Sequence, residues 1–172
     1  MPVKFFAISS AAVFLVCSSV FAAPEIVNVK WQKSYKQDGK VKFEDLNKII
    51  ISSDGKNKEN LRLLITLKNL ENKPIEGIVI RAAFSMRLAK PGTDSGAWAV
   101  PFYIDERRVA KINAGQQFNA AIPNMDLNNY LNRLKNSDYW INALKAEIMI
   151  EPRKGDDILK NTAQSILPVN AK

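Results

Sequence analysis

The stretch LRLLITLKNLENKPIEGIVIRAAFSMRL, residues 61–88, decides the fold of this chain. Apolar residues occupy every second position near its start, and the alternation resumes after the polar segment Asn-Lys-Pro at 72–74. Because successive side chains of a strand point to opposite faces, this pattern predicts two half-buried strands, which we expect to pair as a hairpin. The alternating positions are Leu61, Leu63, Ile65 and Leu67, then Ile78, Ile80, Ala82, Phe84, Met86 and Leu88.

The same stretch carries a resemblance to a known family. The first alternation leads to Asn69, a polar turn that ends at Pro74, and then Gly77 and the second alternation. In this it resembles the paired central strands of bacterial extracytoplasmic immunoglobulin-like domains of the CARDB and FxLYD kind. The resemblance covers residues 61–88, and the FxLYD signature itself is absent. It implies an immunoglobulin-like fold and no particular function.

Further strands are expected on both sides of this unit. The Asp-Gly pairs at Asp38 and Asp54 are turn signals, and the polar run 53–60 predicts an exposed loop. Pro101 lacks a backbone donor, so the run around it is expected to be an edge strand, and residues 105–108 are expected to turn the chain. The expected strands are 25–35, 48–52, 98–104, 109–112, 118–122, 143–152 and 157–169.

One segment departs from the strand pattern. Apolar residues at i, i+3, i+4 and i+7 predict a short amphipathic helix over about 126–136, with Asn124 as its cap. The complete pattern predicts a mainly β chain folded as an antiparallel immunoglobulin-like β-sandwich, with this helix between late strands. Four aromatic residues are expected to fill the core: Trp31, Phe84, Phe102 and Trp140.

The first residues have the pattern of a secretory signal peptide. Lys4 precedes an apolar run over 5–16, and small residues follow it. Cleavage after Ala22 leaves small residues at the positions that signal peptidases read. We therefore expect residues 1–22 to be removed, residues 23–172 to form a single β-sandwich domain, and the protein to be exported to the periplasm or outside the cell.

Cys17 is the single cysteine of the chain. It follows the apolar run as a lipid-attached cysteine does, but Val16 stands where lipoprotein signals have a small residue, so lipidation is not expected. Cleavage after Ala22 removes this thiol, which leaves no disulfide to hold the domain. No later segment approaches the ~20 consecutive apolar residues that a membrane-spanning helix needs.

The composition argues against most catalytic chemistry. The chain has no histidine, which excludes the common serine hydrolases and, together with the loss of Cys17, cysteine catalysis and typical zinc sites. Ser95, in the stretch KPGTDSGAWAVPF, therefore has no base, and the glycines and proline around it are typical of a turn. No motif for a cofactor or metal is present. The adjacent acids at 105–106 and 156–157 are expected in turns that face water, which does not suit general acid and base chemistry.

The binding features are basic and aromatic. The 25 Lys and Arg residues outnumber the 17 Asp and Glu residues, for a net charge of +8. On the predicted strands, Lys30 is expected to face solvent beside Arg81 and Arg87, while Lys33 and Trp98 supply a further cation and an edge aromatic. Such a basic face suits an anionic envelope polymer or lipid head groups, and export makes nucleic acid a less available partner.

The main prediction is nevertheless that the partner is another protein rather than a polyanion. An edge strand, at 98–104 or at 158–169, offers unpaired backbone groups to a strand of another protein. We therefore expect a non-catalytic exported module that binds or assembles with envelope proteins. Polyanion binding through the basic face is the alternative hypothesis, and a carboxylate-based hydrolase is the third hypothesis.

Overall fold

The computed structural model describes residues 23–52, 55–90, 93, 95–123, 125, 127–152 and 161–171. The predicted signal peptide with Cys17, the proposed cap Asn124 and the acid pair at 156–157 lie outside the described residues. The elements are β1 (Glu25–Gln37), β2 (Lys40–Asp45), β3 (Ile49–Ile51), β4 (Asn60–Lys68), β5 (Ile75–Ala89), β6 (Gly96–Trp98), β7 (Tyr103–Ile112), β8 (Gln117–Ile122), α1 (Leu127–Leu134), β9 (Trp140–Ile150) and β10 (Thr162–Ala171).

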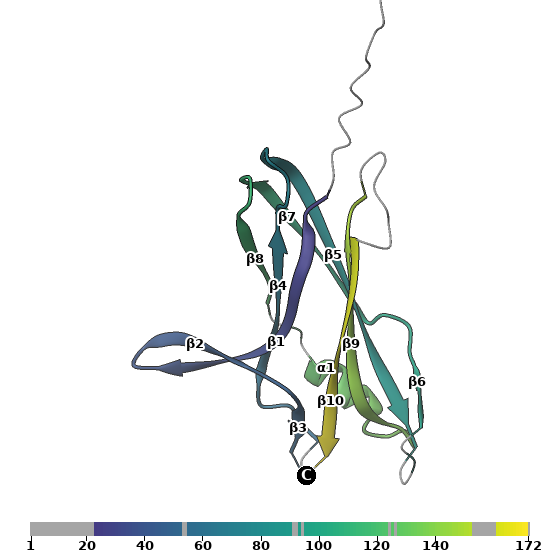
Figure 1. The fold of residues 1–172 in the computed structure, drawn as a ribbon. Helices are drawn as coiled ribbons and strands as arrows, with labels where there is room; N and C mark the ends of the chain where they lie inside the picture. The colour runs from purple at the N-terminus through teal and green to yellow at the C-terminus, as the bar shows by residue number, and fades with distance from the viewer. Residues whose placement is uncertain are drawn as a thin grey trace, which may run out of the picture.

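The strands form two sheets, so the prediction of a mainly β fold with one short helix is confirmed (Figure 1). One sheet has the order β2-β1-β4-β8. The other has the order β3-β10-β9-β5-β6, and β7 also pairs with β5. The expectation that every pair is antiparallel is wrong at one place, because β3 runs parallel to the last residues of β10. There the short strand buries Ile49 and Ile51 against the core.

The expected hairpin of β4 and β5 is not formed. β4 pairs with β1 and β8, whereas β5 pairs with β6, β7 and β9 in the other sheet. The connection between them therefore crosses from one sheet to the other. The buried Asn69 holds it, since its side-chain Nδ2 donates to the carbonyls of Lys73 (2.9 Å) and Ile112 (3.0 Å), and its Oδ1 accepts from the Glu71 amide (2.8 Å).

The alternating apolar residues of β4 and β5 nonetheless form a large part of the core. Each strand presents its apolar positions to the space between the sheets, and the two apolar faces bury each other. Phe84 is 1% exposed and packs edge to face on Trp31, with ring centroids 5.9 Å apart. Phe102 packs at the margin of this core, and the Tyr103 ring also contacts Phe84, with ring centroids 5.7 Å apart.

Trp140 does not belong to the core. Its side chain is half-buried, and its indole Nε1 donates to the Lys90 carbonyl at 3.3 Å. A loop carbonyl thus satisfies the indole N–H at a position that is only half-buried.

The helix α1 packs against the core through one face. It buries Leu127, and the Tyr130 hydroxyl donates to the Phe102 carbonyl at 2.7 Å. Asn128 is tied to the backbone of Asn57 by two hydrogen bonds of 2.8 and 2.9 Å, which fixes the loop before β4. Among the described part of the chain, no helix is both long and apolar enough to cross a membrane.

Three local expectations are corrected by the strands themselves. The predicted strand 98–104 is split into the end of β6 and the start of β7, with Pro101 in the gap, because the proline cannot donate to the ladder. Residues 105–108 lie within β7 rather than in a turn. β2 was not expected at all; with the second half of β1 it forms a hairpin that projects from the sheets (Figure 1).

Candidate functional site

The two sheets meet along one side of the molecule at two strand edges. Over residues 25–31, β1 has β4 on one side, and β2 begins to pair only at Gln32. Over residues 162–168, β10 has β9 on one side, and β3 pairs only with residues 169–171. No described strand occupies the other side of either segment. β1 and β10 contact each other here, and we call these two segments the β1–β10 seam.

One side-chain hydrogen bond joins the two edges. The Trp31 indole Nε1 donates to the Ser165 Oγ at 3.0 Å, while the ring itself packs into the core. Beyond this bond the seam opens into a hollow lined by residues 29–31 of β1, 45–47 after β2, and 165–167 of β10. The backbone amide of Leu46 donates to the Trp31 carbonyl at 2.8 Å and closes one end of this hollow.

The seam is bordered by apolar side chains. Val27 is 40% exposed on β1 and Ile166 is 50% exposed on β10. In contrast, the edge formed by β7 carries four consecutive charged residues, at 105–108. Charged side chains are the usual means of protecting an open edge from further pairing. In the seam, residues 162–168 of β10 carry no charge, and residues 25–31 of β1 carry Glu25 and Lys30, of which Lys30 is paired with Asp45.

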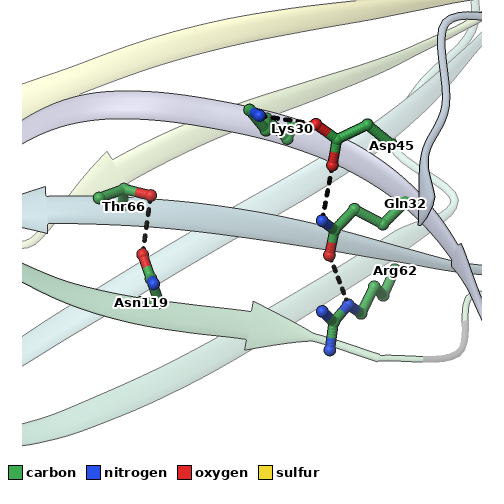
Figure 2. A network of polar contacts seen from close by, with 6 residues as sticks. All are labelled: Lys30, Gln32, Asp45, Arg62, Thr66 and Asn119. Carbon is green, nitrogen blue, oxygen red and sulfur yellow. Dashed lines mark hydrogen bonds and ion pairs between the residues drawn. The ribbon is translucent and has the colours of Figure 1, made fainter. Parts of the chain in front are cut away.

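The charge that lies nearest to the seam is already paired. Lys30 Nζ lies 2.6 Å from Asp45, whose other oxygen accepts from Gln32 at 2.7 Å, and Gln32 in turn accepts from Arg62 at 2.8 Å (Figure 2). The hydrogen bond from Gln32, followed by that from Lys30, lowers the pKa of Asp45 below its ordinary value. Figure 2 shows that this network lies across β1, β2 and β4, and it fixes the base of the projecting hairpin.

The predicted basic face is divided between the two sheets. Lys30 and Lys33 belong to β1, whereas Arg81 and Arg87 belong to β5 in the other sheet, and Trp98 lies on β6. Most of these cations have carboxylate partners. Lys33 lies 3.4 Å from Glu44 and 3.6 Å from Glu59, and Arg81 lies 3.2 Å from Glu106 and 3.8 Å from Glu151.

Arg87 and Trp98 are the two predicted site residues that the structure brings together. They are direct cross-strand partners, and the guanidinium carbon lies 5.7 Å from the indole centroid. Lys145 of β9 places its ammonium 4.9 Å from the same ring, a contact that the sequence pattern did not reveal. Arg87 also donates to the Asn142 side chain at 2.6 Å. The Arg87–Trp98–Lys145 cluster therefore combines two cations with one aromatic ring on β9, β5 and β6, and Lys145 also lies 3.0 Å from Glu147.

The carboxylates at 105–106 do not face a common space. Asp105 points toward the interior side of β7 and lies 3.0 Å from Arg107, while Glu106 points outward and accepts from Arg108 (3.1 Å) and Arg81 (3.2 Å). These bonds, with Arg108 the larger cause, lower the pKa of Glu106. A general acid needs the opposite shift. Within the described residues, no cluster of three or more potential metal ligands occurs.

Sequence reasoning missed the seam because its two halves are far apart in the chain. It did indicate that the terminal strand, 158–169, has an open edge, but not that β1 would lie beside it. A comparison of the chain with family models and with curated proteins finds no match.

Proposed function

We propose that this protein is a non-catalytic binding module that holds an extended segment of a partner protein in the β1–β10 seam. The observation that carries the proposal is the presence of two strand edges, along 25–31 and 163–168, that no described strand pairs on the outer side and that lie beside a shared hollow. Extended peptides add to such edges because their main-chain groups pair with the free N–H and C=O groups of the sheet. Val27 and Ile166 then supply apolar contacts to alternate side chains of the added strand.

The setting of this function is part of the proposal. The expected signal peptide directs the chain out of the cytoplasm, so the partner is expected to be an envelope protein. Strand addition suits that setting because it needs neither a cofactor nor an energy source, and it gives affinity from the main chain and specificity from the pockets at alternate positions. The charge distribution supports a protein partner more than a polymer at this seam, since Lys30 is already paired with Asp45.

We also propose that the fold is of immunoglobulin-like type. The strand order supports this: β1, β4 and β8 are neighbours in one sheet, and β10, β9, β5 and β7 are neighbours in the other. In immunoglobulin-like sandwiches the second and third strands likewise lie in opposite sheets. The crossing between β4 and β5 has this form, and β2, β3 and α1 are then additions to the connections.

The test uses selected peptides as the probe. Random linear peptides displayed on phage are selected against the folded protein, and the enriched peptides are synthesised and measured by calorimetry. Binding is expected to protect amides in residues 25–31 and 162–167 from hydrogen exchange, and Ile166→Glu is expected to weaken it at least about tenfold by placing a charge on the edge. Ile104→Glu is the control, because Ile104 is also exposed but lies on β7.

The proposal fails if the enriched peptides protect another surface, or if both variants weaken binding equally. It also fails if selection enriches no peptide that binds the folded protein. Both isoleucines are exposed, so neither change is expected to unfold the protein, and the melting temperatures of the variants check this.

A second candidate function is anion binding at the Arg87–Trp98–Lys145 cluster. Two cations beside one indole suit a ligand that combines an anionic group with a flat or ring-shaped face. Retention of the protein on heparin, used as a model polyanion, is then expected to fall in Arg87→Gln and to remain in Lys111→Gln, which removes a cation from β7. Equal loss in both variants would mean that binding reflects net charge alone.

A further inference from the structure

The projecting hairpin has an open edge of its own. The arm, residues 33–45, consists of the end of β1, the turn at Asp38 and Gly39, and β2. All six residues of β2 are exposed, including Val41 (55%) and Phe43 (43%). Among the described strands β2 pairs only with β1. In Figure 1 the arm extends away from both sheets, so its outer edge is accessible to another molecule.

The direction of the backbone groups on β2 follows from one hydrogen bond. The Leu46 amide donates to the Trp31 carbonyl at 2.8 Å, so the backbone groups of Leu46 point toward β1. Backbone groups alternate in direction along a strand, so those of Glu44 and Lys42 also point toward β1. Those of Val41 and Phe43 therefore point to the open edge, where they can pair with another strand.

The charges on β2 are separated along the strand. Lys40 and Lys42 lie in its first half, and Glu44 and Asp45 lie at its end. Two identical strands that pair antiparallel bring the basic half of one against the acidic half of the other. If the two-fold axis is perpendicular to the sheet, residues that lie opposite each other in the two copies have their side chains on the same face of the sheet. Because side chains alternate between faces, each residue can then pair only with a residue of the other copy whose number differs by zero or by an even number.

Two registers near the middle of β2 satisfy this even spacing, one centred on Phe43 and one centred on Lys42. A pairing centred on Phe43 places Lys42 of each copy opposite Glu44 of the other, at a non-hydrogen-bonded pair where side chains lie closest. A pairing centred on Lys42 places two lysines opposite each other, which is destabilising. In the first register Phe43 of each copy meets Phe43 of the other on the axis, and both apolar side chains lose exposed area.

We propose that the arm is a self-association site, at which a second copy of this chain pairs antiparallel along β2 in the register centred on Phe43. The four-stranded sheets of the two copies then form one continuous sheet. This site consists of different residues from the β1–β10 seam, so a failure of one proposal does not contradict the other.

The first test exchanges the charges. Sedimentation equilibrium over a range of concentrations measures the dimer dissociation constant of the full chain and of Lys42→Glu, Glu44→Lys and the double variant. Each single change creates two like-charged pairs across the axis and is expected to weaken dimerisation about tenfold or more, whereas the double change restores opposite charges and is expected to recover it. Far-ultraviolet circular dichroism and melting temperature confirm that each variant is folded.

The second test fixes the register. In a Cys17→Ser background, Phe43→Cys is the only thiol, and mild oxidation is expected to give a disulfide-linked dimer, because a pair on the axis has Cα atoms about 5.5 Å apart. Val41→Cys is the matched control, since its two copies lie four residues apart along the paired strands, roughly 14 Å. That distance is too long for a disulfide.

A protein that stays monomeric over the full concentration range overturns the proposal. A folded double variant that remains as weak as the single variants, or crosslinking of Val41→Cys as efficient as that of Phe43→Cys, overturns it as well. Recovery in the double variant together with selective crosslinking at Phe43 supports both the surface and the register.

Discussion

Gly96, the first residue of β6, occupies a position that has no room for a side chain. A Cβ atom there would lie 2.6 Å from the backbone carbonyl oxygen of Leu88 and 3.1 Å from the Arg87 side chain. The carbonyl belongs to the long strand β5 and cannot move without disturbing the ladder. Gly96→Ala is therefore expected to destabilise the protein by about 1 to 3 kcal/mol, seen as a lower midpoint in thermal denaturation. Ala97→Ser, at the exposed neighbour, is expected to leave the midpoint nearly unchanged, and an equal effect of both changes would contradict the steric explanation.

The carboxyl group of Asp45 gives a second test at the scale of single residues. Its pKa is lowered by the hydrogen bond from Gln32 and then by Lys30, so the folded state favours the ionised form. Its contribution to stability is thus present above the ordinary carboxyl pKa of ~3.9 and is lost as the pH falls through the lower folded value. Carboxyl carbon NMR titration is expected to give a raised Asp45 midpoint in Gln32→Ala and an unchanged one in Asn119→Ala. A raised midpoint in both variants would mean that the lowered pKa of Asp45 depends on polar residues across this face of the sheet rather than on Gln32.

At the scale of elements, the Tyr130 side chain helps to hold α1 against the core. The Tyr130 ring lies 4.5 Å from the Phe102 ring, and its hydroxyl donates to the Phe102 carbonyl. Tyr130→Phe keeps the ring contact and leaves that carbonyl without this donor, which is expected to cost about 1 kcal/mol and to speed amide exchange in α1. Tyr139→Phe serves as the control because Tyr139 is exposed. Faster exchange throughout the sheets, rather than in α1, would contradict the local role.

The elements also show how far the sequence predicts this fold. Alternation located β4 and most of β5 because it reports which side chains are buried. Of the expected exposed loop 53–60, residues 55–59 lie outside the strands, but Asn57 is buried and Asn60 begins β4. Alternation did not predict the partner of either strand, since a polar turn such as the one after Asn69 can reverse the chain within a sheet or carry it to the next sheet. β2 was missed although Lys-Val-Lys-Phe alternates at 40–43, because none of its residues is buried.

At the scale of the whole molecule, the candidate site depends on contacts between residues that are far apart in the sequence, and local sequence patterns do not predict such contacts. Trp31 was expected in the core, which is confirmed, but its hydrogen bond to Ser165 joins residues far apart in the sequence. The residues of the expected basic face are divided for the same reason, because Lys30 and Arg81 have similar strand positions but lie in different sheets. Exposure can be inferred from period-two patterns, whereas proximity requires the sheet order.

The sheets are expected to fold as one unit, because each has an apolar face that only the other covers. Phe84 lies at the centre of this contact, packing against Trp31 of the opposite sheet and Tyr103 of its own. Phe84→Ala is therefore expected to reduce the free energy of unfolding by about 3 to 5 kcal/mol, measured by denaturant titration. Phe118→Ala removes the same ring from a position that is 39% exposed and is expected to cost much less. Fluorescence and circular dichroism should give one coincident transition in both variants; two separate transitions would mean that one sheet is stable without the other.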